Sequence, residues 1–408
     1  MEKVGFRVLK VCPQTQARLG EMATPHGTGP TPAFVPVASR GTVRSISPQE
    51  LREIGVDMVL GNTYHLYLQP GTEVIRGFGG LHTFMGWSGP LLTDSGGYQV
   101  FSLANMRRVN DEGVLFRSPT DGKEHFFTPE LSVEVQQALG ADIIMAFDHP
   151  PAYGQDREAV ARATQRSHLW AERCLKAHQT ENQLLWAIIQ GGVSAEMRQA
   201  SARHLASLDF PGYALGGLSL GEPREVMWHM VELSLAQLPT AKPHYLMGVG
   251  SPEELVEGVA RGIDLFDSAL PTRVARNGAF FTRSGRHQIR HQSFKDSKGP
   301  LQEGCACFAC LNFSAGYIHH LFKAEELLGL RLTTIHNLSF VTRLMAQIRQ
   351  AIESGEFPGF RQDFLARYQP TNQEVKLAQK EQWLKKWGLT AGDGRDDAHL
   401  ISGAEGGG

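Results

Sequence analysis

Acidic and amide residues recur in this sequence directly after short apolar runs. Asp94 follows Leu91–Thr93 in the stretch LLTDSGGYQVF. Asp148, Gln190 and Asp267 end later runs of the same kind. A single aspartate after a strand is commonly a turn or helix-capping residue. Three aspartates and one glutamine at equivalent places instead predict a shared cavity in which a ligand meets these side chains.

Glycines stand beside these polar residues. Gly96 and Gly97 follow Asp94, and Gly216 and Gly217 end another apolar run. Because glycine has no side chain, these positions leave room for a ligand close to the backbone. The segment beside Asp94 is therefore expected to leave space for a ligand and not only to form a turn.

Two or three carboxylates in one pocket suit the cleavage of a glycosidic bond. One carboxylate can attack the anomeric carbon while another handles the proton of the leaving group, and nearby negative charge stabilises the oxocarbenium-like transition state. Glutamine, aspartate and backbone groups together can read the edge of a purine, and Tyr98 or Met247 can cover its face. These residue types therefore predict recognition and cleavage at a purine nucleotide.

The elements that must position these residues alternate regularly. Seven apolar runs are predicted as strands buried on both faces: Met58–Leu60, Leu91–Thr93, Ile143–Phe147, Leu185–Ile189, Tyr213–Leu215, Tyr245–Met247 and Ile263–Phe266. Helical segments between them include Glu158–Ala177, Ala195–Leu208 and Pro252–Arg261, the last with Ser251 as its N-cap. So many repeats without a break favour an α/β fold of the closed (β/α)8, or TIM barrel, type over two doubly wound domains. In such a barrel the polar strand ends meet at one face, where active sites lie.

A cysteine cluster breaks this alternation between about residues 299 and 340. Cys305, Cys307 and Cys310 crowd into the segment CACFAC, and His336 follows after about one helical segment. Three thiolates and one imidazole form the tetrahedral set that structural zinc favours, and a full shell leaves no open position for catalysis. His319 or His320 is an alternative fourth ligand.

A basic stretch joins the last predicted strand to the cysteine cluster. It contains seven basic residues: Arg273, Arg276, Arg283, Arg286, Arg290, Lys295 and Lys298. A charged run is commonly only a solvated surface. This run begins just after Asp267 at the mouth of the cavity, however, where arginine can grip a polyanionic backbone.

Bulk properties agree with an enzyme of the cytoplasm. The chain has 408 residues, 41% apolar residues and a formal net charge of -2, which neither requires nor excludes a nucleic-acid partner. No apolar run approaches the roughly 20 residues of a membrane span, and the N-terminus has no signal-peptide pattern. Residues 1–368 are predicted as the barrel domain with its zinc subdomain. Residues 369–408 are predicted as a polar, partly disordered tail, with a short basic helix at Gln373–Trp387.

Seven segments, in order, resemble the tRNA-guanine transglycosylases, or queuine tRNA-ribosyltransferases, most closely those of bacteria: TDSGGYQVFSL, IIQGG, GGLSLGE, YLMGVG, GIDLFDSALPTRVARNG, the cysteine cluster and LTTIHNL. The resemblance runs from roughly residue 6 to 368. It implies a (β/α)8 barrel with a zinc-binding insertion and one structural Zn2+ per subunit. It also implies a pentosyltransferase of queuosine biosynthesis. Such an enzyme exchanges guanine at the wobble position of tRNAs with a GUN anticodon for a 7-deazaguanine, usually as a homodimer on one tRNA.

The resemblance also implies a role for each motif residue. Asp267 matches the nucleophile that attacks the ribose C1′, and Asp94 the general acid/base. The positions that read or cover the base are Asp148, Gln190, Gly216, Gly217, Tyr98 and Met247. Those that contact tRNA are Arg273 and Arg276. The zinc ligands are Cys305, Cys307, Cys310 and His336.

One departure from the family pattern concerns the incoming base. Bacterial members usually have Asp-Glu-Cys where this chain has Asp148, His149 and Pro150. The position after this aspartate helps to shape the pocket around the 7-substituent, so the aminomethyl precursor, the nitrile precursor and queuine all remain open. Ser268 replaces a frequent cysteine beside Asp267, and little effect is expected from it.

Three other functions are less well supported. A non-catalytic tRNA-binding subunit would lack active-site residues, whereas Asp94 and Asp267 are both present. A zinc-dependent hydrolase would need an open metal site at the strand ends, where His65 and His149 are the only nearby histidines. A plain RNA-binding protein would not need a nucleophile at the end of a strand.

Overall fold

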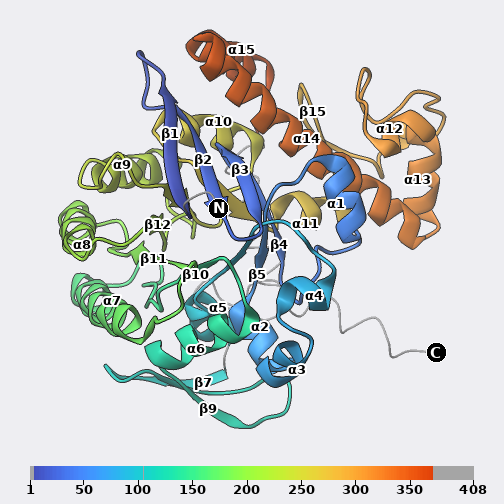
Figure 1. Ribbon diagram of the computed structural model, residues 1–408. Coiled ribbons are helices and arrows are strands. Elements are labelled where there is room, and N and C mark those ends of the chain that lie inside the picture. Colours follow the sequence, from blue (N-terminus) through green and yellow to red (C-terminus); the bar gives the residue numbers. More distant parts are fainter. Residues whose placement is uncertain (1–3, 104, 371–408) are drawn as a thin grey trace.

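The computed structural model describes residues 4–103 and 105–370. Eight parallel strands close into a barrel in the order β10-β11-β12-β13-β14-β4-β5-β6 (Figure 1). The barrel strands are β4 (Ala33–Ala38), β5 (Val59–Gly61), β6 (Leu91–Thr93), β10 (Ile143–Met145), β11 (Leu184–Ile189), β12 (Tyr213–Leu215), β13 (His244–Leu246) and β14 (Leu265–Ser268). The predicted (β/α)8 barrel is therefore confirmed.

Helices connect the barrel strands and cover their outer surface (Figure 1). They are α1 (Pro48–Ile54), α2 (Thr63–Leu68), α3 (Thr72–Gly77), α4 (Leu81–Met85), α5 (Gly97–Leu103), α6 (Pro129–Leu139), α7 (Arg157–Ala177), α8 (Ala195–Ser207), α9 (Arg224–Leu235), α10 (Pro252–Ala260) and α11 (Leu270–Arg276). The predicted strands and helices agree with these bounds to within two residues. Ser251 is the residue before α10, as predicted, but its hydroxyl donates to Glu254 Oε2 (2.6 Å) instead of capping the helix.

The eighth barrel strand, β4, was not predicted from the sequence. Its segment AFVPVA contains Pro36, and a proline inside an apolar run argues against a central strand because it has no N–H to donate. In the barrel, β4 pairs with β14 on one side and with β5 on the other. Without β4 the barrel would not close.

A three-stranded antiparallel sheet, β1 (Gly5–Val11), β2 (Arg18–Thr24) and β3 (Gly27–Thr31), covers the N-terminal end of the barrel. Met22 belongs to the apolar cluster that fills the barrel, and Phe6 packs against it. Arg18 donates to Asp264 (Nε to Oδ1, 2.9 Å), just before β14 begins. These contacts leave the opposite, C-terminal end of the barrel as the face where the polar strand ends gather.

Two further units complete the fold. A second antiparallel sheet is formed by β7 (Asn105–Val109), β8 (Val114–Arg117) and β9 (Glu124–Phe127). After the barrel come β15 (Ala279–Thr282), β16 (Gly285–Gln288), the 3-10 turn η1 (Gln292–Phe294), α12 (Phe308–Asn312), α13 (Ala315–Lys323), α14 (Leu327–Ser354) and α15 (Phe357–Arg367). Helix α14 begins beside the cysteine cluster and ends beside α15, so it joins the cysteine-containing subdomain to the barrel (Figure 1).

Two sequence predictions concern membrane spans and the C-terminal tail. Within the described ranges, no helix has the length and apolar character needed to cross a membrane. The predicted polar tail and the basic helix Gln373–Trp387 lie outside the described residues, apart from the first two residues of the tail.

Candidate functional site

Asp94, Asp148 and Asp267 come together at the C-terminal end of the barrel, as the sequence predicted. Asp94 follows β6, Asp148 lies three residues beyond β10, and Asp267 is the third residue of β14. Burial raises the pKa of Asp94 to about 7, and the charges of Asp267 and Asp148 add to this rise. A carboxyl group with this pKa can both give and take a proton near neutral pH.

Four donors hold the carboxylate of Asp94 in place. The backbone N–H groups of Thr63 (2.9 Å) and Gly96 (3.3 Å) donate to Oδ1. The side-chain amides of Asn62 (2.6 Å) and Gln99 (3.1 Å) donate to Oδ2. These donors stabilise the ionised form, whereas burial and the neighbouring acids favour the protonated form. The carboxyl group is thus fixed in position while its proton remains exchangeable.

Among the described residues, the two oxygens of the Asp267 carboxylate have different surroundings. The hydroxyl of Tyr245 (2.6 Å) and the backbone N–H of Gly248 (2.9 Å) both donate to Oδ1. Among the described residues, none donates a hydrogen bond to Oδ2, and the side chain is partly exposed. Burial raises the pKa of Asp267, and the bond from Tyr245 opposes that rise. This is the arrangement expected of a carboxylate held on one side and open to an electrophile on the other.

Asp148 and Gln190 form one buried hydrogen-bonded pair. Ser95 Oγ and Gln190 Nε2 each donate to the Asp148 carboxylate at 2.7 Å. Burial raises the pKa of Asp148 to about 6. Gln190 Oε1 is buried and accepts no hydrogen bond within the described part of the chain. A Cβ atom at Gly217 would lie 2.3 Å from that oxygen, so only glycine fits beside it.

The remaining predicted ligand residues lie on the same face. A Cβ at Gly216 would lie 2.7 Å from Gln190 Nε2, so this glycine also abuts the amide. Tyr98 is the second residue of α5 and is 40% exposed. Met247 directly follows β13 and is half-buried. Asn62, Gln99 and Tyr245, in contrast, were not singled out as site residues from the sequence.

The basic residues predicted to contact RNA lie on α11, which begins three residues after Asp267. Arg273 and Arg276 are both half-buried. Burial lowers the pKa of Arg276 to about 10, and the charges of Arg44 and Arg273 contribute. Because repulsion among these arginines favours a bound anion, this edge of the site is suited to a phosphate.

Cys305, Cys307, Cys310 and His336 form the predicted ligand cluster. His336 Nδ1 lies 3.8, 3.5 and 3.3 Å from the three sulfur atoms, in that order. Tetrahedral zinc, with Zn–S near 2.3 Å and Zn–N near 2.0–2.1 Å, requires S···N distances of about 3.5 Å, so the cluster fits the ion. The other ring nitrogen, Nε2, lies 2.7 Å from the carbonyl oxygen of Phe281, which fixes the ring.

The alternative histidine ligands are placed elsewhere. His319 Nδ1 lies 2.7 Å from the carbonyl oxygen of Ile289, and His320 is exposed. Neither belongs to the cluster of metal-binding atoms, whereas His336 does. The choice of His336 in the sequence is therefore supported.

Replacing Cys307 with serine should remove the metal. Cys307 would supply one of the four ligands of a bound ion, and its sulfur also accepts the backbone N–H of Cys310 (3.4 Å) at the start of α12. We expect the zinc content of Cys307→Ser to fall from about one ion per chain towards zero, with loss of the local fold, because structural zinc supplies folding free energy. Metal analysis after dialysis tests this. Cys12→Ser, at a buried cysteine outside the cluster, is the control. Full zinc content in Cys307→Ser would contradict the assignment.

A second group of ligand-type residues, His26, His82 and Asp142, lies at the N-terminal end of the barrel. His26 Nδ1 and Asp142 Oδ1 are already in direct hydrogen-bond contact at 2.7 Å. The two imidazole rings stack with centroids 3.6 Å apart and planes 18° apart. Nearly parallel rings direct their nitrogen lone pairs side by side and not toward one point. The arrangement therefore fits a hydrogen-bonded network better than a metal site.

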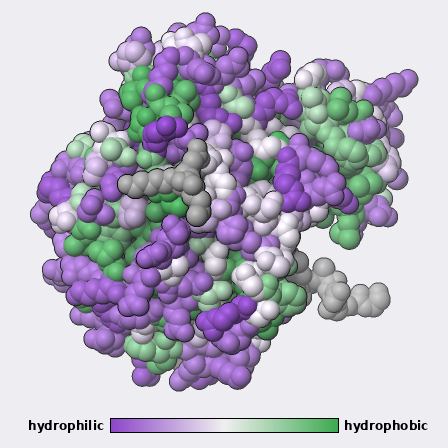
Figure 2. All heavy atoms as spheres, viewed as in Figure 1, coloured by the Kyte–Doolittle hydropathy of each residue, from purple (hydrophilic) through white to green (hydrophobic). Residues whose placement is uncertain are grey.

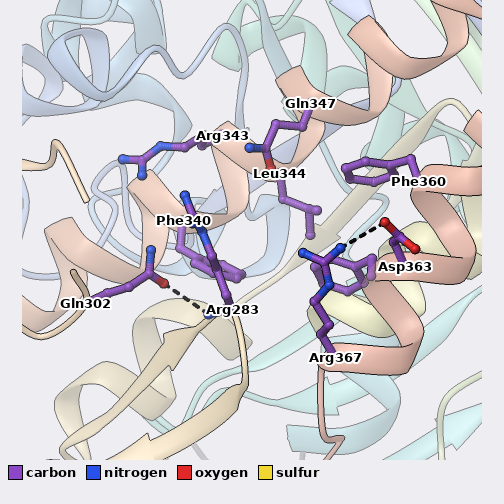
Figure 3. A pocket seen from close by; sticks show the side chains of 10 residues that line it. Arg283, Gln302, Phe340, Arg343, Leu344, Gln347, Phe360, Asp363 and Arg367 are labelled. Atoms are coloured by element: carbon purple, nitrogen blue, oxygen red, sulfur yellow. Dashed lines mark hydrogen bonds and ion pairs between the residues drawn. The ribbon is translucent and has the colours of Figure 1, made fainter. Parts of the chain in front are cut away.

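Figure 3 shows a separate cavity of about 250 Å³ between α14, α15 and the β15–β16 turn. Its floor is aromatic and its rim holds three arginines, of which Arg367 pairs with Asp363 (2.8 Å). The backbone N–H of Arg283 donates to Gln302 (3.1 Å) at the same rim. Because none of the three clustered aspartates lines it, this cavity is distinct from the candidate active site.

Comparisons with known proteins agree with this geometry. The sequence profile of the family described as Queuine tRNA-ribosyltransferase matches residues 12–370. A Queuine tRNA-ribosyltransferase of Dehalococcoides mccartyi is 53% identical over 379 residues, which cover 93% of this chain and 97% of the relative. One from Pelotomaculum thermopropionicum is 54% identical over 366 residues, 90% of this chain and 99% of the relative. One from Staphylococcus aureus is 52% identical over 369 residues, 90% and 97%.

These similarities extend over both the barrel and the cysteine cluster. They confirm the family resemblance seen in the motifs and the prediction of an enzyme of the pentosyltransferase class. The chain belongs to the queuine tRNA-ribosyltransferase family.

Proposed function

We propose that this protein exchanges guanine at the wobble position of tRNAs with a GUN anticodon for a 7-deazaguanine, in the biosynthesis of queuosine. The observation that carries the proposal is the pairing of two different carboxyl groups in one pocket. Within the part of the chain that the structure describes, no residue donates to Asp267 Oδ2, which is open to attack, and Asp94 has a pKa of about 7. The first is suited to a nucleophile and the second to a proton carrier.

The reaction proceeds in two displacements. Asp267 Oδ2 forms a bond to C1′ of the wobble nucleotide while the C1′–N9 bond breaks, and the departing guanine takes a proton from Asp94. The incoming base then gives its ring-nitrogen proton to Asp94 and attacks C1′, which releases Asp267. The covalent intermediate divides one difficult substitution into two easier ones, and configuration is retained.

The base is recognised by the buried pair of Asp148 and Gln190 together with the backbone at Gly216 and Gly217. The unpartnered Gln190 Oε1 supports this, because a buried acceptor without a partner is costly unless a ligand donates to it. Aromatic stacking is sequence-tolerant and suits the exposed Tyr98, with Met247 on the other face of the base. The nucleotide must be flipped out of its stack to enter.

The tRNA backbone is held by α11. Arg276 Nη1 is buried and has no partner in the described part of the chain. The guanidinium remains charged near neutral pH, since its pKa is still about 10. A phosphate beside Arg276 and Arg273 would satisfy this donor and offset the repulsion between the arginines.

The identity of the incoming base depends on the surroundings of Asp148. His149 stacks on Phe101, with ring centroids 4.1 Å apart and planes 7° apart. Arg166 Nη1 lies 3.2 Å from His149 Nδ1. A ring and a guanidinium thus stand next to the position that binds the base edge. The aminomethyl precursor, the nitrile precursor and queuine therefore remain the three candidate incoming bases, and the exchange experiment distinguishes them.

The function is tested by incorporation of labelled guanine into unmodified tRNA with a GUN anticodon. The label is then chased separately with the aminomethyl precursor, the nitrile precursor and queuine. Incorporation followed by displacement is expected, and the most effective chase identifies the natural base. If no label enters, with metal bound and Asp267 intact, the protein is instead a non-catalytic tRNA-binding subunit.

We further propose a bound Zn2+ at the cysteine cluster, location in the cytoplasm with the tRNA, and a homodimer.

Apolar surface gathers over α12 and α13, at the right of Figure 2. Phe308, Leu311 and Tyr317 are 56%, 69% and 40% exposed there. Contiguous exposed apolar surface of this kind is typical of an interface. Light scattering should give twice the mass of the 44.9 kDa chain, and a monomer at micromolar concentration would contradict the dimer.

A further inference from the structure

We propose that Arg198 is a positioning residue for base recognition, because its guanidinium ties together the two glycine loops that carry Gln190 and Gly217. The inference rests on the proposed function, since it assigns those loops to the base. Arg198 itself does not contact the reacting atoms. It acts through the loops, behind the pocket.

Arg198 lies in the second turn of α8 and is fully buried. Its Nε donates to the carbonyl oxygen of Gly192 (2.8 Å) and its Nη1 to that of Ile189 (3.1 Å). Its Nη2 donates to the carbonyl oxygen of Gly217 (3.3 Å). One planar group thus joins the end of β11, the loop after it and the loop after β12.

The two loops need such a tie. Gly191, Gly192 and Gly217 have φ values of 145°, 54° and 66°. Glycine adopts these conformations readily, but it also has the most conformational freedom to lose when ordered. Gln190 and Gly217 interlock, since even a Cβ atom at Gly217 would lie 2.3 Å from Gln190 Oε1. A shift of either loop would therefore move the carboxamide that faces the base.

Helix α8 supports the same loop at two other points. The hydroxyl of Ser201, almost one turn beyond Arg198, accepts the backbone N–H of Gln190 (3.3 Å). A Cβ at Gly191 would lie 2.8 Å from the backbone nitrogen of Arg198, so the loop runs directly against the helix. Arg198 is therefore the central contact of a platform under the base-binding backbone.

Both the positive charge and the planar shape of the Arg198 guanidinium suit it to bonding the three carbonyl groups. Burial lowers the pKa of Arg198 to about 9 while the nearby carboxylate of Glu222 opposes this, so the side chain stays charged near neutral pH. Glu222 in turn accepts the backbone N–H groups of Ser219 and, at 2.9 Å, Leu220 in the loop after Gly217. Lysine carries the same charge but has a single nitrogen, which cannot reach three carbonyl groups that point in different directions.

The test is the steady-state kinetics of base exchange by Arg198→Lys. We expect KM for free guanine to rise roughly tenfold or more and KM for tRNA to change less than about twofold, because small misplacement of binding groups is costly and the tRNA backbone is held elsewhere. The matched control is Arg18→Lys. Arg18 is also buried and donates to two backbone carbonyl groups and to Asp264, but at the other end of the barrel. It should lose stability without a change in KM for guanine.

If Arg198→Lys folds, two outcomes would overturn the inference. One is an unchanged KM for guanine in folded Arg198→Lys. The other is an equal rise in Arg18→Lys, which would indicate a general loss of stability. If Arg198→Lys fails to fold, Ser201→Ala removes only the acceptor for Gln190 N–H and should raise KM for guanine by a smaller factor; no rise would also overturn it. Failure of the proposed function is separate, since it would appear as no exchange by the unaltered protein.

Discussion

Asp267→Asn is expected to abolish base exchange while tRNA binding remains. The amide oxygen can still accept the hydrogen bonds from Tyr245 and Gly248, so the pocket should keep its shape. A neutral amide cannot form the bond to C1′ or stabilise the positive charge that develops there. We expect the exchange rate to fall by at least about 10⁴-fold. Labelled-guanine incorporation measures the rate, and a gel-shift assay measures tRNA binding.

Asp264→Asn provides a control next to the same strand. Asp264 precedes β14 at the opposite end of the barrel, where it is fully buried and pairs with Arg18. Its replacement should lower the stability of the fold, because it weakens a buried ion pair, yet each folded molecule should still exchange base. If Asp267→Asn keeps its exchange activity, or if the two variants lose activity in proportion to stability, Asp267 is not the nucleophile.

The barrel could be predicted from the sequence because its strands are short, apolar and regularly spaced. Two strands that the sequence did not reveal, β4 in the barrel and β3 outside it, have identifiable causes. β4 contains Pro36, which argues against a strand until the closing partners β14 and β5 are known. β3 has the sequence GTGPT and carries no apolar pattern at all. Its place is set by pairing with β2, a tertiary contact that local propensity does not encode.

The aspartates of the site were predictable from their places at strand ends, but the residues that donate hydrogen bonds to them were not. Tyr245 was taken only as a strand residue, and its hydrogen bond to Asp267 requires β13 and β14 to be adjacent. Gln99 is one residue beyond Tyr98 and reaches Asp94 only because α5 turns back over the strand end. The one indication of Arg198 in the sequence is that it is the only cation on the buried face of α8, beside Ser201, Ala202 and Leu205. A buried face with a single arginine indicates a structural contact but does not say to which loop.

Asp94→Asn is expected to stall turnover by removing the proton carrier. Asparagine cannot protonate the leaving guanine or accept the proton of the incoming base, so we expect the rate to fall by about 10²–10⁴-fold. In the unaltered protein, single-turnover release of guanine should decline as pH rises through about 7, because Asp94 then loses its proton. In the variant the residual rate should not show this decline. A rapid-quench measurement across pH 5–9 tests both expectations.

Stability measurements separate this proton role from a general effect on folding. The pKa of Asp94 is raised from 3.8 to about 7 in the folded protein, so its contribution to the free energy of unfolding is present below pH 3.8 and is lost as pH rises toward about 7. Asp94→Asn should remove this pH dependence. Asp142→Asn is the matched control. Asp142 is also buried, and it accepts the backbone N–H of Leu91 (2.9 Å) at the start of β6, the strand that Asp94 follows. Because Asp142 lies far from the reacting atoms, at the N-terminal end of the barrel, its variant should keep the decline of guanine release near pH 7. An Asp94→Asn protein that releases guanine at the unaltered rate, with the same dependence on pH, would assign the proton to another group.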